Sequence, residues 1–230
     1  MALVIGDIHG RLKKAERFLA YKPEVKHIFA GDYADSFDAK DTEIYNTLKL
    51  VIESDADLII GNHDLHYFGR PPFSCTGFRP HMASGLGDIF ESFIDRFEPA
   101  IAADGFLITH GGLTTGLADM LYINYLDLGL IMNKIQAEWE HYLEIRLKAA
   151  GELSPIFHIG RCRGGDNKFS GIFWADYRED EMYDIPQIFG HSKTAYGCII
   201  EVKRGHWALG CDNDNYICFN TATQLIEEFT

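Results

Sequence analysis

The first third of the chain contains three short apolar segments that each end in glycine followed by an acidic or amide residue. The three pairs are Gly6-Asp7, Gly31-Asp32 and Gly61-Asn62. Between them, apolar residues recur at helical spacing over residues 11–20 and 44–52. This alternation predicts parallel strands joined by crossover helices, a βαβαβ unit.

The middle of the chain has a different pattern. An apolar segment before His110 predicts a fourth strand, and residues 88–97 have the apolar spacing of a helix. A helical pattern over about residues 118–150 ends before Gly151, which suits a glycine just past a helix end. We interpret it as a helical cap beside the site, and we expect residues 70–80 to form a loop.

Short strand-like segments follow Gly171. They lie between turn-forming residues such as Lys203-Arg204-Gly205, and we expect them to be mostly antiparallel. The predicted strands are residues 172–174, 188–189, 198–202, 206–209 and 216–219.

Composition excludes several classes of protein. The 230 residues are 47% hydrophobic, enough for one folded domain over residues 1–230. The formal charge of −13 disfavours binding to long nucleic acid, and with it a nuclease. No apolar run approaches the about 18 residues that span a membrane, and the first apolar stretch is too short for a signal peptide.

The cysteines point to a reducing compartment. There are five, an odd number, and none has the C-x-x-C spacing of a zinc site. We expect free thiols in the cytoplasm, mostly in strands. The cysteines are Cys75, Cys162, Cys198, Cys211 and Cys218.

The polar residues at the strand ends predict a metal site. Asp7 and His9 are two apart, so in an extended strand end their side chains point the same way. The carboxyl ends of neighbouring parallel strands meet at one edge, which brings Asp32 and Asn62 to the same patch. Carboxylate, amide and imidazole ligands suit Mn, Fe or Zn better than calcium.

This set of ligands is larger than one ion needs, so we expect two divalent ions bridged by Asp32. Two ions about 3.5–4 Å apart can hold the attacking and departing oxygens of a displacement at phosphorus. A water shared by both ions would be largely hydroxide near neutral pH. The residues thus indicate hydrolysis of a phosphoester.

Five segments, in order, resemble the motifs of the calcineurin-like metallophosphoesterases. The match is most similar to the branch that holds phosphoprotein phosphatases and symmetrical diadenosine tetraphosphatases, and residues 61–66 resemble the latter in particular. This resemblance implies an α/β fold of the metallophosphatase type: a β-sandwich flanked by helices, with a helical insertion at about residues 113–160. The segments are Gly6-Asp7-Ile8-His9-Gly10, Gly31-Asp32-Tyr33-Ala34-Asp35, Gly61-Asn62-His63-Asp64, His110-Gly111-Gly112 and Gly190-His191.

The resemblance also implies a role for each matching residue. Asp7 and His9 would bind the first metal, Asp32 would bridge, and the second metal would be bound by Asn62, His110 and His191. His63 would donate a proton to the leaving oxygen, and Asp35 would orient it and raise its pKa. The resemblance favours Mn, with Fe, Zn, Ni or Co as alternatives.

Two histidine assignments stay open at this point. His158 is the alternative to His110 as a ligand, although the strand before His110 and the two glycines after it favour His110. Among the histidines expected to be structural or exposed, His66 is the one that could approach the site. The others are His27, His81, His141 and His206.

The chain departs from the family pattern where phosphate is bound. Ser36-Phe37 stands in place of Arg-Gly, and Asp176 stands where some relatives have arginine two residues after the tryptophan. Serine does not replace the bidentate contact of a guanidinium group. Three arginines are candidate substitutes, with Arg163 first because two glycines follow it: Arg161, Arg163 and Arg178.

Three functions remain open from the sequence. The first is a phosphomonoesterase acting on phosphoprotein or a small phosphate ester, and the second is a hydrolase of dinucleoside polyphosphates such as diadenosine tetraphosphate. The third is a metal-binding regulatory module that has lost catalysis, suggested by the missing arginine. We expect no membrane partner, and the sequence predicts no oligomeric state.

Overall fold

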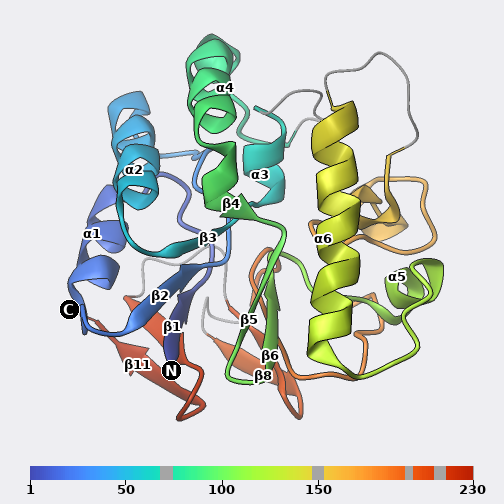
Figure 1. Ribbon diagram of the computed structural model, residues 1–230. Helices are drawn as coiled ribbons and strands as arrows, with labels where there is room; N and C mark the ends of the chain where they lie inside the picture. Colours follow the sequence, from blue (N-terminus) through green and yellow to red (C-terminus); the bar gives the residue numbers. More distant parts are fainter. Residues whose placement is uncertain (68–74, 147–152, 195–198, 210–215, 230) are drawn as a thin grey trace.

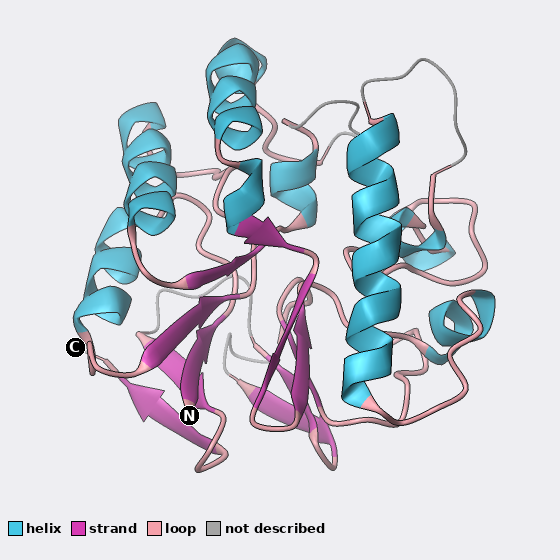
Figure 2. Ribbon diagram, viewed as in Figure 1, coloured by secondary structure: helices cyan, strands magenta, loops and turns pink. Residues whose placement is uncertain are grey.

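The computed structural model describes residues 1–67, 75–146, 153–194, 199–209 and 216–229 (Figure 1). Two β-sheets lie in the middle of the molecule, with helices on their outer sides (Figure 2). The first sheet has the order β11-β10-β1-β2-β3-β4, and the second has the order β5-β6-β7-β9-β8. The metallophosphatase-type α/β prediction is confirmed.

The first sheet is built around the predicted βαβαβ unit. Strands β1, β2 and β3 pair in parallel, and β4 continues the parallel order. Helices α1 and α2 make the two crossovers. The bounds are β1 Ala2–Ile5, α1 Leu12–Ala20, β2 Lys26–Phe29, α2 Asp41–Glu53, β3 Asp57–Ile59, α3 Asn62–Leu65 and β4 Phe97–Glu98.

The C-terminal strands confirm the antiparallel prediction only in part. Two hairpins are antiparallel, β8 with β9 and β10 with β11, and β10 also pairs antiparallel with β1. Strand β7 pairs in parallel with both β6 and β9. A long segment between β6 and β7 makes the first parallel pairing possible. The second is possible because the chain runs through β8 before it returns as β9. The bounds are β5 Ala100–Ala103, β6 Phe106–Thr109, β7 Gln187–Phe189, β8 Ile200–Lys203, β9 His206–Ala208, β10 Ile217–Asn220 and β11 Leu225–Glu228.

The two faces of the first sheet enter different parts of the core. Ala2 and Val4 of β1 pack against residues of the second sheet such as Ile108, which makes the sandwich. Leu3 and Ile5 alternate with them and pack on the helical side. The remaining helices are α4 Ala83–Ser92, α5 Thr115–Met120 and α6 Leu128–Ile145, and α6 lies along β5 and β6 (Figure 1).

Several predicted elements differ in the structure. The helical pattern over residues 118–150 is divided into α5 and α6, and the Asp127 carboxylate caps the start of α6 by accepting the Leu130 N–H at 2.9 Å. The predicted helix over residues 88–97 ends at Ser92 and gives way to a short 3₁₀ turn and β4. Residues 172–174 form a turn closed by N–H bonds to the Gly171 carbonyl, not a strand.

The cysteine prediction also needs correction. Cys75 lies in a loop and Cys162 in a 3₁₀ turn, so Cys218 in β10 is the one strand cysteine in the described chain. Cys198, Cys211, the Gly151 cap and residues 70–74 of the predicted loop lie outside the described residues.

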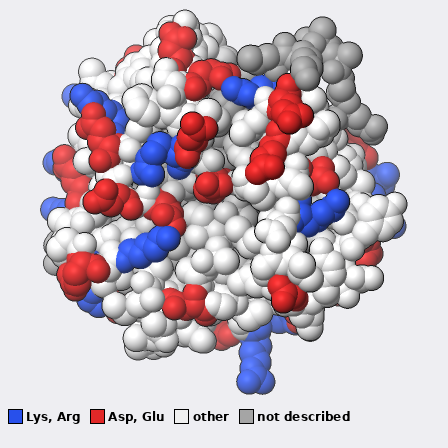
Figure 3. All heavy atoms as spheres, viewed as in Figure 1, with Lys and Arg blue, Asp and Glu red and all other residues white. Residues whose placement is uncertain are grey.

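The surface charge and the helices can be compared with the sequence predictions on nucleic acid and membranes. Acidic side chains are spread among basic ones over the face shown in Figure 3. No helix in the described chain is long and apolar enough to cross a membrane. The division into one domain with an insertion at residues 113–160 stays a prediction.

We expect Leu48→Ala to lower the free energy of unfolding by about 2–5 kcal/mol, because Leu48 lies on α2 fully inside the core. Denaturant titration measures this loss. Leu130→Ala is the control, since Leu130 on α6 is 51% exposed and should cost far less. Equal losses for the two variants would contradict the packing described here.

Candidate metal centre

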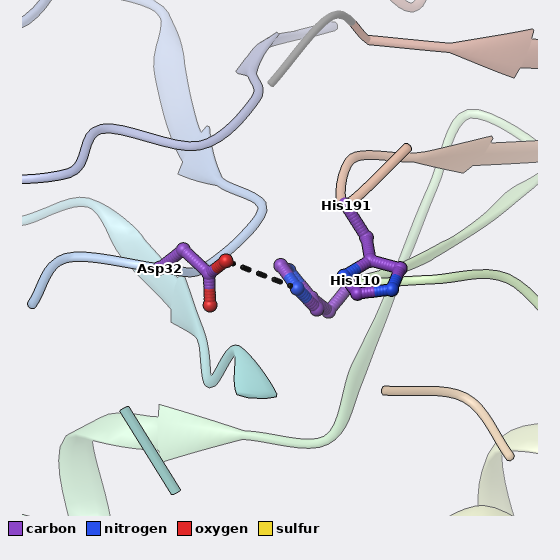
Figure 4. A group of neighbouring side chains, drawn as sticks. All are labelled: Asp32, His110 and His191. Carbon is purple, nitrogen blue, oxygen red and sulfur yellow. Dashed lines mark ion pairs between the residues drawn. The ribbon is translucent and has the colours of Figure 1, made fainter. Parts of the chain in front are cut away.

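The predicted ligands gather at the carboxyl ends of strands from both sheets. Asp7 and His9 follow β1, Asp32 follows β2, and Asn62 begins α3 directly after β3. From the second sheet, His110 follows β6 and His191 follows β7. Figure 4 shows Asp32 and His110 pointing toward each other with His191 beside them, and the Asp32 Oδ2 to His110 Nε2 distance is 3.4 Å.

The backbone takes a strained conformation at these residues. His9, Asp32, Asp35 and His191 have φ between 45° and 61°, half of the eight positive-φ residues other than glycine in the described chain. Such residues cost about 1–3 kcal/mol each and cluster at functional sites. The strain indicates that the loops are shaped for a purpose beyond stability.

Two glycines are required by the close approach of carboxylates. A Cβ at Gly61 would lie 2.1 Å from Asp32 Oδ1, and a Cβ at Gly190 would lie 2.4 Å from Asp7 Oδ1. Neither position has room for a side chain. The glycines before Asn62 and His191 therefore let the two sheets bring their ligands together.

Backbone carbonyls fix the protonation of two histidines. His9 Nδ1 lies 2.9 Å from the Asp35 carbonyl, and His110 Nδ1 lies 2.8 Å from the Ala30 carbonyl. A carbonyl only accepts, so each Nδ1 carries the proton and each Nε2 offers a lone pair. His9 Nε2 lies 3.7–3.8 Å from Asp7 and Asp32 oxygens, within reach of a shared cation.

Two histidine rings meet the side-chain oxygen of Asn62, and one of them presents an acceptor atom to it. His110 Nε2 and His191 Nδ1 lie 2.8 and 3.0 Å from Asn62 Oδ1, and the Asn62 amide nitrogen donates to Cys75 Sγ instead. Burial lowers the pKa of His110 to about 4, so its Nε2 has no proton to donate. The lone pairs of His110 Nε2 and Asn62 Oδ1 repel at this distance unless both atoms bind the same cation.

The residues therefore fit two cations. Two groups, Asp7-His9-Asp32 and Asp32-His110-His191, each hold ligand atoms within 4.8 Å of one another, and both include Asp32. Burial and the charge of Asp7 raise the pKa of Asp32 well above its usual range. A buried pair of carboxylates is unfavourable without positive charge, which divalent ions would supply.

A carboxylate that sequence reasoning left without a role connects two of the loops. Asp64 is fully buried and accepts the N–H groups of Tyr33 and Ala34 at 2.9 Å and of Gly61 at 3.0 Å. Burial raises the pKa of Asp64 to about 7, and the three N–H donors act in the opposite direction. It ties the loop after β2 to that after β3, fixing Asp32 against Asn62.

Asp35 is the centre of a second network. Its Oδ2 lies 2.9 Å from His63 Nδ1 and 2.8 Å from His66 Nε2, and Tyr67 donates its hydroxyl to Oδ1. Burial raises the pKa of Asp35, but the contacts with His63 and His66 outweigh it and lower the pKa to about 2. His66 does approach the site, as expected, whereas Tyr67 gave no signal in the sequence.

A cavity of about 600 Å³ opens over these residues. Arg163 and Arg178 line it, whereas Arg161 is exposed outside the lining, and His158 belongs neither to the lining nor to either ligand group in the described chain. Two further basic residues that sequence reasoning missed line the cavity, Arg11 and Lys193.

Asp176 stands where some relatives have arginine, and it holds two of the arginines that line the cavity, Arg163 and Arg178. Its carboxylate lies 2.9 Å from Arg163 and accepts two bonds from Arg178 at 2.6 and 2.8 Å. Burial raises the pKa of Asp176, but the bonds from Arg178 and the charge of Arg163 lower it overall. Arg163 also donates to Ser192, the neighbour of His191.

The comparisons with known proteins agree with this geometry. The sequence profile of the calcineurin-like phosphoesterases matches residues 2–193, so the chain belongs to this family. No curated protein matches it in a sequence search. The family prediction is confirmed.

A comparison with solved structures gives matches that include these two. One, a crystal structure of a protein provisionally described as a diadenosine tetraphosphatase, has 14% identity and a TM-score of 0.51, and the match covers 98% of this chain and 91% of that one. The other is a Saccharomyces cerevisiae serine/threonine phosphatase with similarity to human PP5. It has 15% identity and a TM-score of 0.40, and the match covers 100% of this chain and 66% of that one. At these identities the first likeness shows the fold alone, and the second is too distant to carry an argument.

We expect Asp64→Asn to lower the free energy of unfolding by about 1–3 kcal/mol, because the new NH₂ group cannot accept a bond from a buried backbone N–H. Denaturant titration with chelator present separates this loss from metal binding. Asp88→Asn on the exposed side of α4 is the control, with an expected change below about 0.5 kcal/mol. Similar values for both variants would exclude the proposed linking role of Asp64.

Proposed function

We propose that the chain is a phosphomonoesterase that uses two divalent ions, on a phosphoprotein or a small phosphate ester. The observation that carries the proposal is that two candidate ligand groups share one buried carboxylate, Asp32, beside a cavity lined by His63, Arg163 and Arg178 among others. The proposed ligands are Asp7, His9, Asp32, Asn62, His110 and His191.

The donor set favours Mn, with Fe, Zn, Ni or Co as alternatives. When bound, two such ions would activate a water as the nucleophile and stabilise charge on the phosphoryl oxygens. The chain's own part is to hold the ligands rigidly: backbone carbonyls fix the rings of His9 and His110, and Asp64 fixes the loops.

His63 is the proposed general acid. Its Nδ1 donates to Asp35 at 2.9 Å, which orients the ring. Asp35 is itself held by His66 and Tyr67, so the ring of His63 is aimed by a supported partner. A proton from His63 to the leaving oxygen would neutralise the developing alkoxide.

Arg163 and Arg178 are the proposed phosphate-binding residues, while Arg161 remains a weaker candidate because it lies outside the cavity lining. Asp176 holds both guanidinium groups, which lets two like charges lie in one cavity. A planar guanidinium matches the oxygens of a phosphoryl group. These arginines would take the place of the arginine missing at Ser36.

A second candidate is the hydrolysis of a dinucleoside polyphosphate. The observation that favours it is the pair of arginines in one cavity, because they provide charge for more than one phosphate group. Location in the cytoplasm is a further proposal that rests on the cysteine content.

The experiment that tests the proposed function measures turnover of p-nitrophenyl phosphate and of diadenosine tetraphosphate with added Mn²⁺. We expect hydrolysis of the monoester that is lost on chelation. Cleavage of the dinucleotide alone would favour the second candidate. Bound metal without turnover of either substrate would favour the regulatory module.

We expect His63→Ala to lower kcat by about 100-fold or more while metal content stays normal, because His63 contacts Asp35 and is not a proposed ligand. Steady-state kinetics together with elemental analysis measure both quantities. His81→Ala is the control, since His81 is exposed, pairs with Asp41 and lies outside the cavity lining. Loss of metal from His63→Ala would show that the assignment of His63 is wrong.

A further inference from the structure

Phe37 is an exposed aromatic side chain at the candidate active site. It is 80% exposed, and it lines the same cavity as Asp35, His63 and the two arginines. None of the other large apolar side chains that the described chain exposes lines this cavity. Those are Met1, Phe93, Met120, Tyr122, Leu126, Leu130, Leu225 and Ile226.

The backbone is anchored on both sides of Phe37. The Ser36 hydroxyl accepts the N–H of Ala39 at 3.0 Å, which closes the turn after Asp35. Arg79 donates to the carbonyls of Ser36 and Ala39 at 2.7 Å each and pairs with Asp41. Phe37 therefore has a defined position in the loop although its side chain is exposed.

The ring of Phe37 lies beside a glycine in the neighbouring loop. A Cβ built on Gly77 would be 3.7 Å from Phe37 Cζ, so the edge of the ring lies near residues 75–78. The high exposure of the side chain means that most of the ring remains open to a ligand. An exposed aromatic face on an anchored loop offers a surface on which a second ring can stack.

The position of Phe37 assigns it to one part of the substrate. Phe37 follows Asp35 by two residues, and Asp35 orients His63, the proposed proton donor to the leaving oxygen. Arg163 and Arg178, proposed for the phosphoryl group, come from the separate segment between α6 and β7. The leaving group is therefore the part of the substrate nearest the loop of Phe37.

We propose that Phe37 is a binding platform for an aromatic ring carried by the leaving group of the substrate, and this rests on the proposed function. The ring would stack on the phenyl face. Its source is either an aryl ester of the phosphotyrosine kind or the base of a nucleotide. Phe37 then favours phosphoesters that carry an aromatic ring over aliphatic ones. The family pattern has glycine at this position, which offers no such ring.

The test compares Phe37→Ala with the unchanged enzyme on p-nitrophenyl phosphate, diadenosine tetraphosphate and glycerol 2-phosphate. We expect KM to rise about three- to tenfold for a ring-bearing substrate and to stay constant for glycerol 2-phosphate. The substrate that shows the rise identifies the source of the ring. Phe37→Trp should restore the lower KM, and Phe93→Ala, an exposed phenylalanine outside the cavity lining, is the matched control.

Two results would overturn the inference. One is an unchanged KM for both ring-bearing substrates, and the other is an equal change for all three substrates. If the unchanged enzyme, loaded with Mn²⁺, cleaves none of the three, the proposed function fails and the inference fails with it. Each comparison sets the variant against the unchanged enzyme on the same substrate. Differences in leaving-group reactivity between substrates therefore do not affect the change in KM.

Discussion

The rest of the site depends on two carboxylates, Asp7 and Asp32, that are buried together where the two sheets meet. Burial of like charges is unfavourable, and it raises the pKa of Asp32. The chain nevertheless uses strained backbone at Asp32 and His191 and side-chain-free positions at Gly61 and Gly190 to bring them together. Divalent ions bound at the proposed site would offset this arrangement. The fold brings the ligands to this junction because βα loops of one sheet and strand ends of the other open at the same edge.

Around this pair, separate networks support separate tasks. Asp64 links the loops that carry Asp32 and Asn62. Asp35, in the loop after β2, contacts His63, His66 and Tyr67. Asp176 holds the arginines from the C-terminal part of the chain. No single carboxylate serves two of these networks, although contacts connect them to the proposed ligands: the Asp35 carbonyl accepts from His9, and the His63 N–H donates to Asp32.

The sequence predicted the βαβαβ unit and the gathering of polar side chains at its edge, because both depend on local patterns: a strand, a glycine and a polar side chain at its end. It missed features that depend on distant contacts. The missed residues contact partners that are distant in the sequence: Arg79 contacts Ser36, Tyr67 contacts Asp35 and Asp176 contacts Arg163. No local spacing pattern predicts such contacts. Residues 172–174 read as a strand because a buried turn and a buried strand are equally apolar. The parallel pairing of β7 was missed because it depends on how the chain returns through β8 and β9.

The most direct test of the central claim is the number of metal ions bound per chain. Elemental analysis after reconstitution with Mn²⁺ and removal of free metal should give two ions per chain, because two ligand groups share Asp32. Asp32→Asn should lower both occupancies together, since the bridging carboxylate belongs to both groups. One ion per chain, or two ions that remain fully bound in Asp32→Asn, would contradict the account.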